Sequence, residues 1–160
     1  MRLVAVVPAH TIADGEYDDL AAGRLAALGF ALQVLSSSAS QGRGVVQVGV
    51  PVPITTITGT VLRPGDEVPP LLDAGHLLPL LASAHDDWTA GAELAVTGRL
   101  VVEPYLWAAD GMLWPLAPDG VRIWTVEGIR RVGDDDTEHL ATLPGPTGLD
   151  HGATYLLYLV

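Results

Sequence analysis

Apolar residues alternate with polar or small residues in several short stretches, and such period-two alternation predicts strands that bury one face. The stretch 54–62 is rich in β-branched residues, which supports the same assignment. The stretch 94–102 carries Gly98 near its middle, which indicates a bent strand. The predicted strands lie around Val4 and Val6 and at residues 30–34, 45–48, 54–62, 94–102, 121–132 and 153–160.

Segments dense in Gly, Pro, Ser or Asp separate these strands and predict turns and loops. Residues 36–44 are small and polar, which predicts a flexible connection, and residues 63–66 read Arg-Pro-Gly-Asp, a turn signal. Residues 133–138 include three consecutive Asp and predict a solvated acidic loop. The prolines in 144–148 predict a rigid loop before the last strand.

Two stretches favour helices. A spacing of four between Leu20, Arg24 and Leu28, with acidic residues ahead of them, predicts a helix over residues 17–28. A second helix is predicted over residues 79–88, because leucines without β-branching cluster there and proline suits the first turn of a helix.

Six or seven short strands with one or two helices define a mostly β fold, a small barrel or sandwich. The length of 160 residues matches one domain. Hydrophobic residues make up 49% of the chain and charged residues 17%, which is enough apolar material for a core and too apolar for a disordered chain.

The chain is acidic, with eight Arg and no Lys against 19 Asp and Glu, a formal net charge of −11. Overall charge therefore excludes nonspecific attraction to nucleic acid or to an anionic membrane, and a nucleic-acid site would have to be local. The absence of Cys excludes disulfides and thiolate ligands and favours a cytoplasmic protein. Neither a targeting segment nor a membrane span is predicted, because every apolar run is short or interrupted.

Residues 91–100 read Gly-Ala-Glu-Leu-Ala-Val-Thr-Gly-Arg-Leu, and an aromatic loop leads from them to Ile-Trp-Thr-Val-Glu-Gly-Ile at 123–129. This order resembles the last hairpin of single-stranded-DNA-binding proteins with OB folds, in which a G-x-x-x-x-V-x-G-R-L strand precedes an aromatic return strand. The resemblance covers residues 91–132, about a quarter of the chain. It implies a single OB-like domain over residues 1–160 and a surface that binds single-stranded nucleic acid.

The stretch 91–132 also carries the candidate nucleic-acid contacts. It holds four Arg and five acidic residues, a net charge of −1, so −10 of the total −11 lies elsewhere. Aromatic rings there would stack on bases, each worth about 1–3 kcal/mol, and Arg would supply local positive charge. A place in the core is the alternative for each aromatic residue. The candidate binding residues are Arg99, Tyr105, Trp107, Trp114, Arg122 and Trp124.

The chain departs from that family at two points. The family usually carries Lys and Arg across the binding face and ends in a disordered acidic tail. This chain has no Lys, and its last residues, 155–160, form an apolar stretch typical of a sheet strand. The resemblance therefore bears on the fold more directly than on the activity.

Patterns for catalysis or metal binding are weak. His85-Asp86-Asp87 and residues 134–139 have no recognised ligand spacing. The serine-rich run at 36–40 lacks the context of a nucleophile elbow, and Gly42-Arg43-Gly44 is too short to hold a phosphate. The sequence therefore predicts a non-enzymatic protein without a metal or a cofactor.

Two functions are predicted ahead of a small-molecule or enzymatic role, which stays open as a third alternative. The first is an OB-like module that binds single-stranded nucleic acid by aromatic stacking and local Arg contacts. The second is an acidic protein-interaction or assembly module, in which the barrel presents its aromatic hairpin or an edge strand to a protein partner. We expect a homo-oligomer, because small barrels of this kind associate through their sheet edges.

Overall fold

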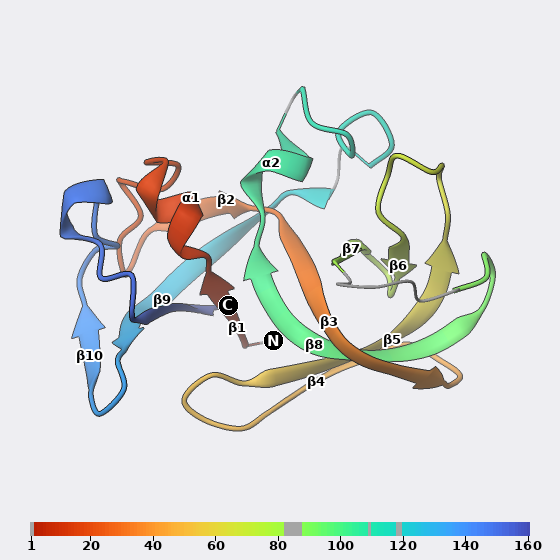
Figure 1. The fold of residues 1–160 in the computed structure, drawn as a ribbon, viewed down its shortest axis with the longest axis horizontal. Coiled ribbons are helices and arrows are strands. Elements are labelled where there is room, and N and C mark those ends of the chain that lie inside the picture. Colours follow the sequence, from red (N-terminus) through yellow and green to blue (C-terminus); the bar gives the residue numbers. More distant parts are fainter. Residues whose placement is uncertain (1, 82–87, 109, 118–119) are drawn as a thin grey trace.

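The computed structural model describes residues 2–81, 88–108, 110–117 and 120–160. Within these residues, eleven strands form one strongly curved sheet with short helices at its margins (Figure 1). The strands are β1 (Leu3–Val7), β2 (Leu25–Leu28), β3 (Phe30–Ala39), β4 (Gly44–Val48), β5 (Ile54–Leu62), β6 (Leu71–Asp73), β7 (Leu77–Leu81), β8 (Glu93–Val102), β9 (Arg122–Val132), β10 (Thr137–Leu140) and β11 (Thr154–Leu159). The helices are α1 (Ala9–Ala13), α2 (Pro104–Trp107) and the 3-10 helix η2 (Pro146–Gly148).

Five of these strands close into a barrel. β8 pairs with both β3 and β5, β5 continues to β6, β6 to β7, and β7 returns to β3. The pairing of β3 with β7 is parallel, and the other pairings in the ring are antiparallel. The ring is compatible with an OB-like barrel in which β3 takes the place of the last strand, although it precedes the other four in the chain. The predicted mostly β fold with a small barrel is confirmed, with eleven strands in place of six or seven.

Strands β1, β2, β9, β10 and β11 form a second lobe beside the barrel, on the left in Figure 1, whereas β4 pairs with β5 of the barrel. β1 pairs with β11, β11 pairs with β9, and β9 also pairs with β10 and, through its first residues, with β2. β2 leads into β3 through Gly29, and β1 pairs with β8 at Val6 and Val101. The second lobe is therefore joined to the barrel at both β3 and β8.

The predicted hairpin between residues 99 and 124 does not form. β8 pairs with β1, β3 and β5, whereas β9 pairs with β2, β10 and β11. Both stretches are strands, as predicted, but they belong to different parts of the sheet. The stretch that resembles a single hairpin in sequence thus supplies one strand to the barrel and one to the second lobe.

The predicted helix over residues 17–28 is wrong, because this segment forms turns and then β2. Gly23 has a φ of +82°, in the left-handed region, which no helix interior adopts. Leu28 is buried and Leu25 is 72% exposed, an alternation that suits a strand paired with β9. The pairing of residues 25–28 with β9 therefore overrides the helix-like spacing of four among Leu20, Arg24 and Leu28.

Two further expectations change in the structure. Pro79 lies inside β7 rather than in the first turn of a helix, because the neighbouring Leu80 packs into the barrel interior. Leu80 and Leu81 also belong to β7 and Trp88 lies outside any helix, while residues 82–87 of that predicted helix, with His85, fall outside the described residues. Residues 36–39 extend β3 instead of forming a flexible loop, since they pair with residues 94–97 of β8.

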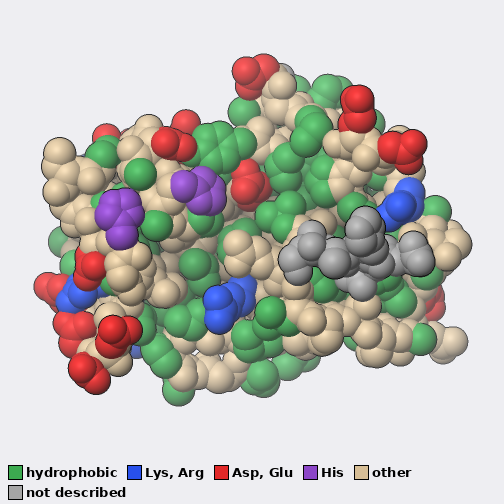
Figure 2. Space-filling view, viewed as in Figure 1, with side chains coloured by type: hydrophobic (Ala, Val, Ile, Leu, Met, Phe, Trp, Pro, Cys, Tyr) green, Lys and Arg blue, Asp and Glu red, His purple; other side chains and the backbone are tan. Residues whose placement is uncertain are grey.

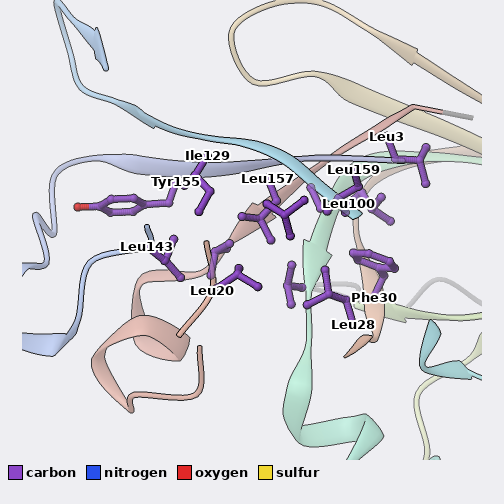
Figure 3. Close-up of a cluster of buried hydrophobic side chains, with 14 of the residues drawn as sticks. Leu3, Leu20, Leu28, Phe30, Leu100, Ile129, Leu143, Tyr155, Leu157 and Leu159 are labelled. Atoms are coloured by element: carbon purple, nitrogen blue, oxygen red, sulfur yellow. The ribbon is translucent and has the colours of Figure 1, made fainter. Parts of the chain in front are cut away.

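Two buried clusters fill the two parts of the fold. Leu32 and Val96 belong to the cluster inside the barrel. The larger cluster of the second lobe extends from Leu143 to Leu100 at the join with the barrel (Figure 3). β3 and β8 contribute side chains to both clusters, so burial of apolar area, worth roughly 25 cal/mol per Å², stabilises both parts through the same two strands.

Gly98 lies where β8 meets β3 most closely, and Figure 1 shows β8 curving strongly along its length. A Cβ atom at residue 98 would lie 2.2 Å from the backbone oxygen of Gln33. The register between the two strands shifts between Val34 and Ser36, directly beside this approach. Absence of a side chain at residue 98 therefore permits the close approach on which the β3–β8 pairing depends.

We expect Gly98→Ala to lower the free energy of unfolding by at least about 2 kcal/mol, because the new methyl group meets backbone that cannot move alone. Urea unfolding followed by circular dichroism measures this change. Gly128→Ala in β9 is the matched control, since nothing lies within 4 Å of its Cβ position, and we expect it to change stability by less than about 1 kcal/mol. Equal effects of the two substitutions would contradict the role of Gly98.

Candidate ligand cavity

The structure separates the six residues predicted to contact nucleic acid. Trp107, in α2, is only 3% exposed, and its indole Nε1–H donates a hydrogen bond of 2.9 Å to the backbone oxygen of Phe30. A Cβ atom at Gly29 or Gly120 would lie within 2.2 Å of its ring, so the two glycines make room for the indole. Trp107 is therefore a core residue, and its ring has no free face on which a base could stack.

Tyr105 lies among carboxylates. Its side chain is 38% exposed, its hydroxyl donates a hydrogen bond to Asp14, and its ring stacks on His10 with centroids 6.0 Å apart. The buried carboxylate of Glu103 accepts hydrogen bonds from the first backbone N–H groups of α2. Burial and the hydrogen bond to Asp14 raise the pKa of Tyr105 to about 12. A phosphate near this ring would meet negative charge, which does not favour binding of a nucleic-acid backbone here.

Arg99 and Trp114 lie on other elements. Arg99 is an exposed residue of β8, and it lies opposite Gln33 of the neighbouring strand β3 in the barrel wall. Trp114 is 40% exposed in the segment that follows α2. Neither residue lines the cavity described next. Of the six predicted contacts, the structure brings together Arg122 and Trp124, both on β9.

Arg122 and Trp124 open onto a cavity of about 340 Å³, which we call the β9 cavity. It lies between the barrel and the second lobe, since its walls come from β1, β2 and β9 on one side and from β5, β7 and β8 on the other. It is lined by Leu3, Leu28, Phe30, Arg43, Gly44, Val45, Ile57, Ala74, His76, Leu77, Leu78, Leu100, Gly120, Arg122 and Trp124. Most of these side chains are aliphatic or aromatic, as in ordinary small-molecule sites.

Two aromatic rings form part of this wall. Phe30 and Trp124 meet edge to face, with ring centroids 5.6 Å apart and an angle of 79° between their planes. Such a contact is favourable and orients both rings. The indole nitrogen of Trp124 is buried and has no hydrogen-bond partner among the described residues, so only apolar packing holds this side chain.

The charged groups of the cavity are basic. Arg43, His76 and Arg122 line it, and all three side chains are exposed to solvent. Arg43 forms an ion pair of 3.1 Å with Asp73. A second hollow of about 360 Å³ adjoins the cavity, shares His76 and Arg122 with it, and is lined in addition by Asp73. With His76 neutral, two Arg and one Asp give this region a local charge of +1, against −11 for the whole chain.

Negative charge gathers elsewhere on the molecule. Figure 2 shows acidic side chains clustered at the lower left, where Figure 1 places β10. There Arg131 forms ion pairs with Asp136, Glu138 and Asp150, which neutralises part of the acidic segment. Within the described part of the chain, no group of three or more His, Asp and Glu side chains is arranged to hold a metal ion. The predicted absence of a metal at residues 134–139 stays a prediction.

Sequence reasoning missed most of the cavity. The sequence predicts a strand for Phe30 and a flexible connection for Arg43, and no pattern links either residue to His76. Three lining residues show how distant these positions are in sequence. Arg43 lies 13 residues after Phe30 along the chain, and Trp124 lies 94 residues after Phe30. Only the topology of the two lobes brings them together.

Comparison of the chain with known protein families, with curated proteins and with solved structures finds no match. The barrel is compatible with the resemblance to single-stranded-DNA-binding proteins, but no related protein supports this resemblance. Among the described residues, no helix is long and apolar enough to cross a membrane.

Tyr105 provides a pH test of this part of the structure. We expect its phenol to ionise near pH 12, above the ordinary value of 10, in an ultraviolet titration compared with that of Tyr105→Phe. Because the raised pKa belongs to the folded state, its contribution to stability is complete below pH 10 and is lost as the pH rises toward 12. Asp14→Asn should lower this pKa, and an unchanged titration in that variant would contradict the contact.

Proposed function

We propose that the protein is a non-enzymatic binding module and that a small molecule occupies the β9 cavity. The observation that carries the proposal is an apolar cavity of about 340 Å³ with Arg122 and Trp124 at its wall. That volume lies at the lower end of the range of about 300–1,000 Å³ for ligand pockets. Removing the apolar part of a ligand from water would provide most of the binding free energy.

The chemistry of the lining favours binding over catalysis. Besides Arg43, His76 and Arg122, the described residues that line the cavity are Gly, Ala, aliphatic or aromatic. A nucleophile paired with a base, or two carboxylates, would be needed for hydrolytic chemistry. A set of apolar walls with a few basic groups instead binds and orients a ligand.

Single-stranded nucleic acid is the second candidate. It is favoured by the position of Arg122 beside Trp124, since a base packed on Trp124 and Phe30 would leave its phosphate near an Arg. The burial of Trp107 and the carboxylate beside Tyr105 reduce the stacking surface available to such a strand. Among the predicted aromatic contacts, a nucleic acid would therefore be left with Trp124 in the β9 cavity and the exposed Trp114.

The edge strand β4 supports the assembly alternative. It pairs with β5 alone and ends the sheet. Its exposed Val46 and Val48, followed by Val50 at 93% exposure, form an apolar strip beside free backbone groups. Such an edge is suited to pairing with another chain. The experiment below therefore includes a measurement of mass.

We expect naphthol, a neutral ring system of about ten heavy atoms that suits the cavity, to bind saturably in isothermal titration calorimetry. Ala74→Phe, which places a ring at the half-buried cavity wall, should abolish this binding. Ala39→Phe, the same substitution at an exposed end of β3, is the matched control and should bind as the natural chain does. Binding that is absent, or equal in both variants, would contradict the proposal.

A thymidine oligonucleotide of about thirty nucleotides, longer than the ~4–16 nucleotides that one barrel occupies, tests the second candidate in the same samples. Saturable binding that salt weakens and Arg122→Gln reduces would assign the cavity to a nucleic acid. Light scattering gives the mass. A natural chain that is multimeric and does not bind naphthol, and whose mass falls in Val46→Asp, would favour the assembly function.

A further inference from the structure

The walls of the β9 cavity divide by chemistry. Its interior is aliphatic and aromatic, with Leu100 and Ile57 among the buried residues. The basic residues that line it, by contrast, are exposed to solvent. A ligand that fits both parts has an apolar body and a polar or charged end.

The volume limits the size of the apolar body. A cavity of about 340 Å³ lies at the lower end of the ~300–1,000 Å³ of small-molecule sites, which favours a compact ligand over a two-chain lipid or a long acyl chain. An unbranched chain of about eight carbons with a small head group matches the space.

Charge selects the sign of the head group. Arg122 is exposed and has no carboxylate partner among the described residues, while Arg43 is held by Asp73. A guanidinium without a carboxylate partner in the described part of the chain, together with a paired one, suits a single negative charge. A planar guanidinium binds a carboxylate through two parallel hydrogen bonds, which gives strength and orientation.

We infer that the ligand of the β9 cavity is a medium-chain aliphatic carboxylate of about eight carbons, with its chain in the apolar interior and its carboxylate at Arg122. This inference rests on the proposed function and adds to it the class of ligand. Asp73 beside Arg43 disfavours a dianion such as a phosphate monoester, because its own charge would repel the second negative charge. A positively charged amphiphile is disfavoured by the guanidinium groups.

Competition with naphthol separates the parts of the ligand. Octanoate, octanol and butyrate are each titrated as competitors against bound naphthol in calorimetric experiments at low and at moderate salt. We expect octanoate to bind about tenfold more tightly than octanol, because the charge-assisted contact adds to the same chain. We expect butyrate not to compete, since it keeps the head group and loses most of the apolar area. Added salt should weaken the binding of octanoate and leave the binding of octanol unchanged.

Arg122→Gln tests the head-group contact. We expect it to reduce octanoate affinity about tenfold and to change octanol and naphthol affinity much less, because the apolar part of the lining, which those two ligands contact, stays as it is. Arg63→Gln, at an exposed Arg in the turn after β5, is the matched control and should change none of the three affinities. Naphthol binding shows that each variant is folded.

The outcomes distinguish the ligand class from the site. If naphthol binds but octanol competes as well as octanoate, or Arg122→Gln weakens both alike, the inference of a carboxylate is overturned and the proposed site stands. If naphthol itself does not bind the natural chain, the proposed function fails together with the inference. A tenfold preference for octanoate that disappears in Arg122→Gln supports both.

Discussion

The pairing of β3 with β8 is the contact on which both parts of this fold depend. It is possible because residue 98 has no side chain where the Gln33 backbone oxygen approaches β8. The barrel closes through these two strands, and the second lobe is joined to them by β2 and β1. Because side chains of β3 and β8 belong to the barrel cluster and to the second-lobe cluster, a change at their crossing affects both of these clusters.

The β9 cavity is a consequence of how the second lobe leaves the barrel. β1 pairs with β8 at Val6 and Val101, and the side-chain amide of Gln47 then binds the backbone N–H and C=O of Val4, each at 2.8 Å. This side chain takes the place of a strand neighbour and holds β4 against β1. Leu3 from β1 and Val45 from β4, the residues next to this contact, line the cavity. A space bounded by two lobes and held by such a contact is preformed in the fold.

Local patterns in the sequence predict strands well where the chain alternates or is β-branched, as in β5, β8, β9 and β11. They fail at residues 17–28 and at Pro79, where strand pairing with distant segments overrides local spacing. Of the predicted contacts, Arg122 and Trp124 line the cavity because both belong to β9, whereas Trp107 is buried and Tyr105 is held by Asp14. Arg43, His76 and Phe30 could not be linked from sequence, because only long-range topology brings them together.

The indole N–H signals of the four Trp residues report directly on where a ligand binds. In nitrogen-labelled protein titrated with naphthol, we expect the signal of Trp124 and the backbone amides around Arg122 to shift. Trp88, whose indole donates to Ser37 and which does not line the cavity, should move little. Largest shifts at Trp114 and Tyr105, or no shift at Trp124, would contradict a ligand site in the β9 cavity.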